Sequence, residues 1–580
     1  MVKKFQAQQG YSLVSVLLIF TLIGIIGLSL TAYTMNSLKG VVKNKESIEN
    51  KVNAENSIEM GLAYIDQEIE NLNNGDLNES TALPLLQSAL DHVAALGVNN
   101  GYTLERKIIK NSGVILEEVT IKSPIGQTGK FIKKKVTIST IAEVFQYSTV
   151  SPSDLVLNGA PYLEGDVLVN GNVYTRNQGK FIKYRLILPD RDYWVNTSYP
   201  AIKGNLTVSG GYYRYNQKQN SWVPFIPEPD NMNKYFSVVP KMLNRNLLTE
   251  TILPKNLVDE KKKTEISQKN LKTYWLNDFG KVVGPTTING SAEFLRLGIL
   301  ESGKLVINGD ARINGNLRID PEGELIVKGD LFVGGDLKIR TAQKLLREKS
   351  GGKLTVEGSI HVNGKGYLGS ELIDLNKYTP DEVSKYGSLT LGSEDSFIYI
   401  DEKTEIKNFN FTGKMYIEDS VDINGDFNTN GTVYVTRQAN IEDFSDKDGT
   451  AVIIADEEVT IANNNEFEDK PKVLNAYFYS NRQLEIFGIG SNLKIHGGVY
   501  GNPVVLNVTK GKTKDKPFAN SFSVGPSLDK LYFQERQTSL APTTSRLSII
   551  YNKGMVLNPP IGIPTVDKFT MKELETIYEK

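Results

Sequence analysis

The residues best placed for chemistry in this sequence are aspartates. Four of them follow glycines in a β-rich region: Asp310, Asp330, Asp336 and Asp426. Carboxylates gathered on one face of a right-handed β-helix can act as general acid and base on polysaccharides, and Asp190 and Asp192 beside Arg191 are a second candidate pair. A short side chain at a corner also bonds its own backbone, which explains these aspartates without catalysis. Calcium along the four is conceivable, but the spacing lacks a calcium-loop motif.

Other groups that enzymes use are scattered or absent. The three histidines, His92, His361 and His496, are too far apart in sequence to suggest a metal motif, and the chain has no nucleophile elbow or P-loop. It has no cysteine, which excludes disulfides and thiol chemistry and is compatible with export. We therefore expect no enzymatic activity, no cofactor and no metal.

Aromatic residues form another candidate site. Tyr212, Tyr213, Tyr215 and Trp222 lie in a proline-containing segment, 212–285, that interrupts a glycine repeat. Such rings could contact a cell-wall or surface ligand, through sugar faces or protein side chains. They could equally pack into a small subdomain of their own.

Charge argues against nucleic acid as a partner. The formal net charge is −1. The lysine runs 133–135 and 261–263 are expected to be solvated turns or a strand edge rather than a phosphate-binding groove.

Short strands must position these side chains. Six segments have two glycines six positions apart, with alternating apolar residues between them: Gly165 to Gly171, Gly204 to Gly210, Gly309 to Gly315, Gly329 to Gly335, Gly358 to Gly364 and Gly425 to Gly431. Alternation predicts half-buried strands, and glycine permits positive φ at sharp corners. Matching strands at 305–307 and 325–327 suit one coil of a β-solenoid, although an antiparallel sandwich also fits.

The repeat divides the body of the chain. We expect solenoid coils at 154–211, the aromatic insertion at 212–285, further coils at 286–440 and a β-rich continuation at 441–580. A helix near 571–578 would cap the last coil, as solenoids require. Interruptions at 341–351 and 374–385 are expected to be side loops, and Ser-Pro-Ser at 151–153 to be a linker.

The N-terminal pattern is helical. An uncharged, mostly apolar run at 11–33 follows Lys3 and Lys4. A helix of this length spans the roughly 30 Å core of a bilayer, and the lysines favour a cytoplasmic N-terminus with the body outside. The residues expected to face the membrane are Leu13, Val14, Leu17, Leu18, Ile19, Phe20, Leu22, Ile23, Ile25, Ile26, Leu28 and Leu30.

The helical pattern continues past the apolar run. No proline interrupts it up to Leu72, and apolar residues recur at helical spacing with charges between them. We expect one helix from about Ser12 to about Leu72, with its second half against a small head at 36–150. A helix at 80–96 and strands at 102–109, 114–122 and 131–147 would complete that head.

The residues around Gly10 resemble a type IV prepilin leader. A short basic peptide, 1–10, ends at Gly10, and an apolar assembly helix, 11–35, begins with the aromatic Tyr11. In that family a prepilin peptidase cuts after the glycine and methylates the new N-terminus. Most pilins have a glutamate five residues after the cut, where this chain has Ser15. That glutamate compensates a neighbour's buried amino-terminal charge, so its absence suits a minor subunit at a filament tip. An ordinary signal anchor is the alternative.

The C-terminal third has a looser similarity. Residues 475–480 and 493–501 look like the glycine repeats of large pilin-like proteins with a PilX-type N-terminal region. The sequence thus predicts a mainly β fold with a long N-terminal α-helix: a pilin-like helix and small α+β head, then a right-handed β-helix-like solenoid.

The expected function is that of a non-enzymatic minor pilin or pseudopilin of a type IV pilus or type II secretion-like filament. It would be single-pass in the cell membrane and display the solenoid at the surface or tip for adhesion or assembly. Expected partners are the membrane, other pilin-like subunits and a prepilin peptidase. The alternatives are a monotopic surface protein that binds cell-wall polymer and a β-helix enzyme acting on polysaccharides.

Overall fold

The computed structural model describes residues 6–579 except 76, 78, 111–112, 184–190, 244–251, 253–258, 272–279, 343–348, 370–384, 446–448, 465–467 and 513–539. The chain divides into two compact units. The head unit contains the residues up to Thr140 and those from Val566, and the solenoid unit contains Ile141–Thr565. Each has its own hydrophobic core.

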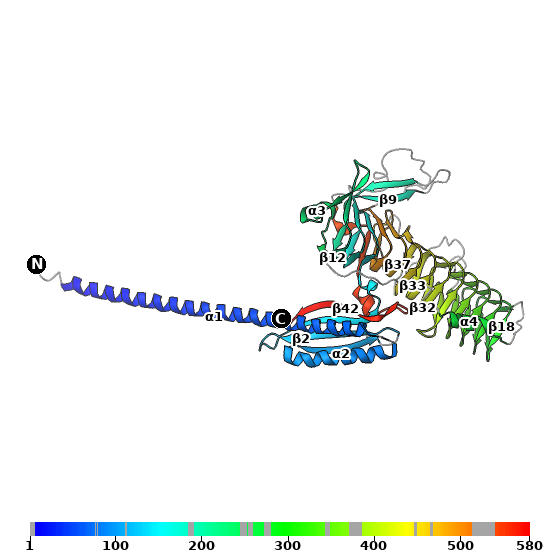
Figure 1. The fold of residues 1–580 in the computed structure, drawn as a ribbon, viewed down its shortest axis with the longest axis horizontal. Helices are drawn as coiled ribbons and strands as arrows, with labels where there is room; N and C mark the ends of the chain where they lie inside the picture. The colour runs from blue at the N-terminus through cyan, green and yellow to red at the C-terminus, as the bar shows by residue number, and fades with distance from the viewer. Residues whose placement is uncertain are drawn as a thin grey trace. The chain divides into compact units, whose positions relative to one another are not determined.

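The head unit contains two helices and a four-stranded sheet in the order β1-β2-β3-β42. Its elements are α1 (Gln6–Asn73), α2 (Glu79–Asn100), β1 (Thr103–Lys110), β2 (Leu116–Pro124), β3 (Phe131–Ile141) and β42 (Thr565–Tyr578). α1 is one unbroken helix (Figure 1). Ile58, Leu62, Ile65 and Ile69 are buried at steps of three and four residues, so one face of the C-terminal part of α1 enters the head core.

Residues 571–578 form a strand and not a cap helix, so that prediction was wrong. β42 extends the sheet beside β3. Ion pairs join the two strands, with Glu573 Oε2 3.0 Å from Lys134 Nζ and Glu575 Oε1 3.5 Å from Lys135 Nζ. β3 therefore lies between β2 and β42, so the lysine run 133–135 is in an inner strand and not in a turn or at a strand edge. The carboxylates of β42 lie opposite these lysines.

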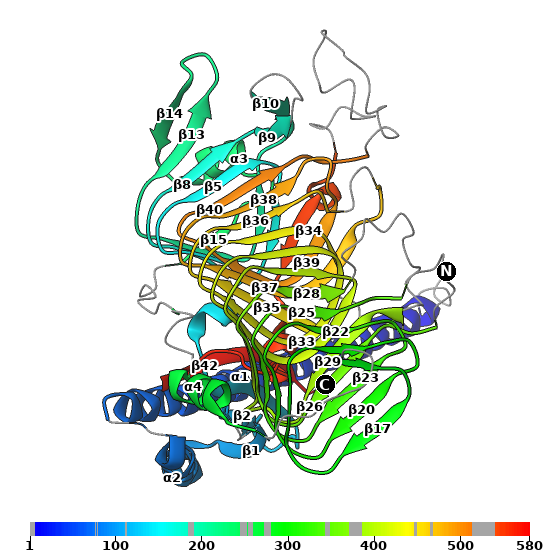
Figure 2. The ribbon, with the colours of Figure 1, turned by 90° about the vertical axis from the view of Figure 1, so that its right-hand side faces the viewer.

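The solenoid unit is built of short parallel strands stacked coil on coil (Figures 1 and 2). The first strands of this unit, in chain order, are β4 (Thr149–Ser151), β5 (Leu155–Gly159), β6 (Tyr162–Glu164), β7 (Val167–Val169), β8 (Val173–Arg176), β9 (Gln178–Lys183), β10 (Arg191–Asn196), β11 (Ala201–Lys203), β12 (Asn205–Val208), β13 (Tyr212–Asn216), β14 (Ser221–Phe225) and β15 (Lys241–Met242). The strands that follow are β16 (Lys281–Val282), β17 (Pro285–Ile288), β18 (Ala292–Phe294), β19 (Leu297–Ile299), β20 (Lys304–Ile307), β21 (Ala311–Ile313), β22 (Leu317–Ile319), β23 (Glu324–Val327), β24 (Leu331–Val333), β25 (Leu337–Ile339), β26 (Lys353–Val356), β27 (Ile360–Val362), β28 (Gly366–Gly369), β29 (Gly387–Leu391), β30 (Phe397–Ile400), β31 (Thr404–Lys407), β32 (Phe409–Ile417), β33 (Val421–Val435), β34 (Ala439–Ser445), β35 (Thr450–Ala455), β36 (Val459–Ala462), β37 (Lys472–Ser480), β38 (Leu484–Gly488), β39 (Leu493–Tyr500), β40 (Val504–Val508) and β41 (Leu547–Ile550).

Short helices accompany these strands. They are η1 (Glu143–Gln146), α3 (Pro229–Tyr235), α4 (Glu260–Gln268), η6 (Pro542–Thr544) and α7 (Lys553–Leu557). The repeating unit is clearest at β20, β21 and β22, which pair in parallel with β23, β24 and β25. Alternate side chains such as Leu305, Ile307 and Ile313 point inward and are fully buried. The mainly β, solenoid-like fold is thereby confirmed.

The coils are not stacked in chain order. β5 pairs in parallel with β40, and β6 pairs with β41, so the first coils of the unit lie on its last coils (Figure 2). The chain then crosses to the other end of the stack, and from β16 onward it winds back toward β41. α4 is a described part of that crossing (Figure 1).

Two predicted boundaries were wrong for this reason. Ser151 is buried in β4, and its hydroxyl donates to Gly501 O at 3.0 Å, so 151–153 is not a free linker. β13 pairs in parallel with β8, so the start of the predicted insertion at 212–285 belongs to a coil. The partner strands are remote in sequence, and a local pattern does not reveal them.

Candidate functional sites

The N-terminal part of α1 is apolar and exposed. The residues predicted to face a membrane, from Leu13 to Leu30, are each between 50% and 75% exposed. The Thr21 and Thr31 hydroxyls donate to the carbonyls of Leu17 (3.0 Å) and Gly27 (2.8 Å), so these polar groups are satisfied within the helix itself. Among the described residues, α1 is the one helix long and apolar enough, by length and composition, to cross a membrane.

The predicted processing residues lie on this helix. The backbone of Gly10 and Tyr11 is helical, and the side chain of Tyr11 lies outside the described part of the structure. Ser15 is exposed on α1.

The aspartate corner is the second candidate. Asp310 Oδ1 accepts a hydrogen bond from Asp330 N at 2.8 Å, and Asp330 Oδ1 accepts one from Ser359 N at 2.8 Å. Each carboxylate thus binds the backbone of the following coil, and the expected bond to its own backbone was wrong. Coils are stacked about 4.8 Å apart, which puts the next amide within reach. Asp336 makes the same bond to Lys365 N at 3.1 Å.

The glycines before these aspartates have a related role. Gly329 and Gly358 do not have positive φ, contrary to the prediction for the corners. A Cβ atom would lie 2.2 Å from Asp310 Oδ1 at Gly329 and 2.3 Å from Asp330 Oδ1 at Gly358. The carboxylate of the preceding coil therefore occupies the space that a side chain would need.

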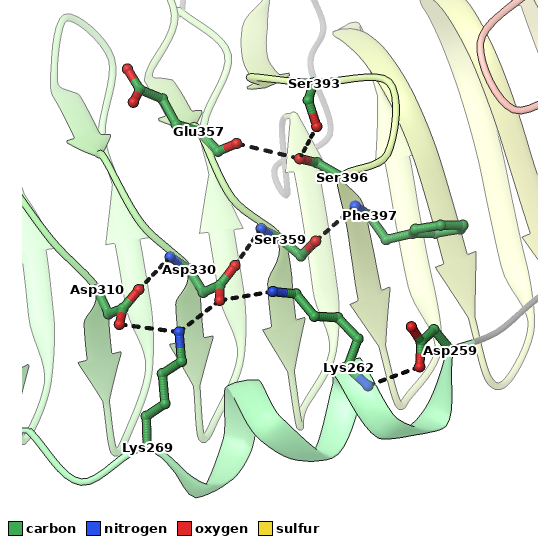
Figure 3. A network of polar contacts seen from close by, with 10 residues as sticks. All are labelled: Asp259, Lys262, Lys269, Asp310, Asp330, Glu357, Ser359, Ser393, Ser396 and Phe397. Atoms are coloured by element: carbon green, nitrogen blue, oxygen red, sulfur yellow. Dashed lines mark hydrogen bonds and ion pairs between the residues drawn. The ribbon is translucent and has the colours of Figure 1, made fainter. Parts of the chain in front are cut away.

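Lysines of the crossing segment cover this corner (Figure 3). Lys269 Nζ lies 3.1 Å from Asp310 Oδ2 and 2.7 Å from Asp330 Oδ2, and Lys262 Nζ lies 3.1 Å from Asp330 Oδ2. Burial alone would raise the pKa of Asp330, but Lys269, the Ser359 amide and Lys262 outweigh it and lower that pKa. Both oxygens of Asp330 are therefore engaged by the chain's own donors, which disfavours a role as a proton acceptor or calcium ligand.

A neighbouring network continues this contact. Asp401 joins His361 Nε2 (2.9 Å) to Lys263 Nζ (2.7 Å), and Lys263 also lies 2.6 Å from Glu418 Oε2. The run 261–263 lies in helix α4, so the prediction of a solvated turn or strand edge was wrong. Sequence reasoning missed this network because its carboxylates come from distant coils. Ile266 is buried beside these pairs, so α4 is held by both apolar and ionic contacts.

The remaining predicted chemical groups are dispersed. Asp426 accepts from the Tyr386 hydroxyl at 2.5 Å, away from the residues around Asp330. Asp190 lies outside the described residues, and Arg191 and Asp192 belong to β10 with side chains that are not described. Within the described ranges, no group of three or more His, Cys, Asp or Glu could hold a metal ion.

The third candidate, which we call the Arg176 cluster, comprises Tyr174, Arg176, Trp194, Tyr213, Tyr215 and Trp222. The guanidinium carbon of Arg176 lies 3.8 Å from the ring centroid of Trp194 and 3.2 Å from that of Tyr215. Trp222 is 5.2 Å from Tyr215 between ring centroids. Tyr174 is stacked on Tyr213 at 5.0 Å. Side chains of β10, β13 and β14 therefore gather around an arginine of β8.

The structure brings together only part of the predicted aromatic site. Tyr213, Tyr215 and Trp222 belong to the Arg176 cluster, whereas Tyr212 points to the solenoid core and is 6% exposed. Successive side chains on a strand point to opposite faces, which separates Tyr212 from Tyr213. The same alternation places Tyr174 and Arg176 together on β8, a signal that sequence reasoning could have used.

Arg176 is buried although its neighbours are exposed. It is 5% exposed, against 37% for Trp194 and 36% for Trp222. Burial lowers the pKa of its guanidinium, and Tyr215 partly opposes that effect. Its Nε has no hydrogen-bond partner among the described residues. The guanidinium is thus held mainly by ring faces.

Comparisons with known proteins leave the family open. No protein-family model matches this chain, and no curated protein matches it. One solved structure that matches is the crystal structure of the competence-associated pilin ComZ from Thermus thermophilus, at 9% identity over 83% of this chain and 88% of that chain. The TM-score is 0.16, too low to establish a shared fold.

Proposed function

We propose that this chain is a membrane-anchored, non-enzymatic minor pilin-like or pseudopilin-like protein. Its α1 helix would join a filament of pilin-type subunits, and its solenoid would be displayed outside the cell for adhesion or assembly. The observation that carries the proposal is the division of α1, which is apolar and exposed in its first part and buried in the head in its last part.

The exposed part of α1 requires an apolar environment. Burying one leucine or isoleucine side chain is worth about 1.5 to 3 kcal/mol, so a run such as Leu13 to Leu30 is strongly unfavourable in water. Lipid satisfies this need before assembly. Neighbouring helices of similar composition would satisfy it within a filament.

The segment between the membrane run and the head is suited to helix packing. Leu38, Val41 and Ile48 are each about 60% exposed, at 59%, 61% and 64%. The side-chain pairs Lys45 to Glu49 and Lys51 to Glu55 lie along the same helix at ion-pair distance. This mixed surface supports contact with adjacent subunits rather than free exposure.

Ser15 favours a terminal position in such a filament. A buried, uncompensated amino-terminal charge is costly, and Ser15 cannot supply a compensating carboxylate. A subunit at the tip would have no neighbour that needs this compensation. The absence of a free carboxylate pair at Asp310 and Asp330 supports a non-enzymatic role for the solenoid.

Intact-mass and N-terminal peptide analysis of the protein purified from its native membrane tests this proposal. We expect a mature chain that begins at methylated Tyr11. An intact Met1, or a cut near Ala32, would contradict the filament role and would favour a monotopic surface protein.

A second measurement tests the position in the filament. Gold labelling of an epitope in the solenoid should mark filament ends, and Ser15→Glu should move label into the shaft or change assembly. Label along the whole filament in the unaltered protein, or no change in Ser15→Glu, would argue against the tip assignment. Ser12→Glu is a matched control, because it adds the same charge at another position.

A further inference from the structure

We propose that the Arg176 cluster binds neutral saccharide chains, with Trp194 and Trp222 as stacking surfaces. This inference rests on the proposed function in one respect, because it names what a solenoid displayed outside the cell would bind. The binding site itself lies wholly within the solenoid unit.

The first step of the argument is the exposure of flat rings. Trp194 and Trp222 are 37% and 36% exposed although each contacts other rings or Arg176. These contacts cover part of each ring and leave the rest of its surface open to solvent. Exposed tryptophan faces of this kind are suited to the apolar C–H faces of sugar rings.

The second step is the fixed orientation of these rings. The guanidinium carbon of Arg176 lies 3.8 Å from the ring centroid of Trp194 in β10 and 3.2 Å from that of Tyr215 in β13, so cation–π attraction holds both rings. Antiparallel pairing of β9 with β10, and of β13 with β14, holds the backbone that bears these side chains. The stacking surfaces are therefore ordered before a ligand arrives, which reduces the entropy lost on binding.

The third step is the polar rim. Two carboxamide pairs lie close in sequence to these residues: Gln178 with Asn196, two positions after Trp194, at 2.9 Å, and Gln217 with Asn177, the residue after Arg176, at 3.2 Å. Asn and Gln side chains both donate and accept hydrogen bonds, as sugar hydroxyls do. Gln217 is exposed, so it can exchange its hydrogen bond to Asn177 for one to a sugar hydroxyl group.

The rim also indicates a neutral ligand. Arg176 is buried, and it acts by positioning the rings rather than by contacting a ligand. An incoming chain would therefore meet aromatic faces and carboxamides. Ring faces match the C–H faces of a sugar and carboxamides match its hydroxyl groups, so this combination fits a neutral saccharide.

Titration of the full-length protein in detergent tests the site. The chain has three tryptophans, so Trp275→Phe leaves only Trp194 and Trp222 to report. The probes are cellohexaose, chitohexaose, maltohexaose and mannohexaose. We expect at least one to shift tryptophan emission and to bind by isothermal titration calorimetry with Kd of about 10 μM to 1 mM.

Variants then assign the binding to the cluster. Trp194→Ala and Trp222→Ala should each weaken the best probe by about tenfold, because each removes one stacking contact. Tyr578→Ala is the matched control, since it removes an exposed ring that also contacts a cation, Lys51, but in the head unit. Arg176→Lys should weaken binding and change near-ultraviolet circular dichroism of the tryptophans, whereas Trp222→Phe should retain most of the affinity.

Two results would overturn the proposal: no binding of any of the four oligosaccharides, or unchanged affinity in Trp194→Ala/Trp222→Ala. The same variants, if folded by far-ultraviolet circular dichroism, exclude loss of structure as the cause. Failure here with a methylated Tyr11 would leave the filament role intact. Binding together with an intact Met1 would leave the saccharide site and remove the filament role.

Discussion

Two buried arginines in the solenoid unit have opposite surroundings. Arg546, 1% exposed, donates to the carbonyls of Ser491 (2.9 Å), Gly490 (2.7 Å), Glu468 (3.1 Å) and Gly511 (3.2 Å). Arg176, 5% exposed, is covered by rings, and its Nε has no partner among the described residues. Burial lowers the pKa of both groups, that of Arg546 to about 10.

The comparison separates structural polar groups from groups that support binding. The Arg546 region satisfies its donors with backbone carbonyls, and the aspartate corner satisfies its acceptors with Lys262 and Lys269. Its contacts are complete without a ligand. The Arg176 cluster instead uses its cation to orient rings whose faces stay exposed, which is an arrangement that leaves contact area for another molecule.

The largest expected effect is that of Arg546→Ala. Removal leaves several buried carbonyls without a donor, so the free energy of unfolding of the solenoid unit should fall by about 3 to 5 kcal/mol. Arg176→Ala should cost only about 1 to 2 kcal/mol, because it loses mainly cation–π contacts. Urea denaturation of the full-length protein, followed by far-ultraviolet circular dichroism, measures both. Equal losses in the two variants would break the comparison.

A smaller effect tests the aspartate corner. Gly329→Ala should lower the free energy of unfolding by about 1 to 3 kcal/mol, because the new Cβ would meet the Asp310 carboxylate at 2.2 Å and force the coils apart. Gly298→Ala is the matched control in the same stack, with no atom within 4 Å of its Cβ position. If both substitutions are neutral, the corner is not a close-packed structural element.

The parts of the fold that depend on local pattern were predictable. Continuous helical spacing predicted α1, and strands at 305–307 and 325–327 predicted parallel coils, which β20 and β23 confirm. The stacking order was not predictable, because β5 and β23 have the same alternation and nothing local says which coil each one meets. β42 was missed since Lys134, its ion-pair partner, is more than four hundred positions away from Glu573.

The candidate sites show the same limit. Tyr213, Tyr215 and Trp222 were predicted from their density in one segment, and they do meet. Arg176 and Trp194 were missed, because they belong to other strands and become neighbours only through coil pairing and hairpin geometry. Asp310 and Asp330 were found by their repeat, but their real partners, the lysines of the crossing segment, follow from tertiary structure alone.

The smallest expected effect is the pH dependence of the aspartate corner. The pKa of Asp330 is lowered in the folded protein, so its stabilising contribution is complete above the unfolded pKa of about 3.9 and is lost as pH falls through the lower folded value. Asp330→Asn keeps an oxygen that can accept from Ser359 N but removes the charge that faces Lys269. The Tm of this variant should therefore lie below that of the unaltered protein at pH 6, and the difference should shrink between pH 4 and pH 2. Asp336→Asn is the control, because it makes the same corner bond and has no ion pair among the described residues. A difference that persists undiminished at pH 2 would mean that the lost stability comes from the shape or hydrogen bonding of the new amide and not from the charge of Asp330.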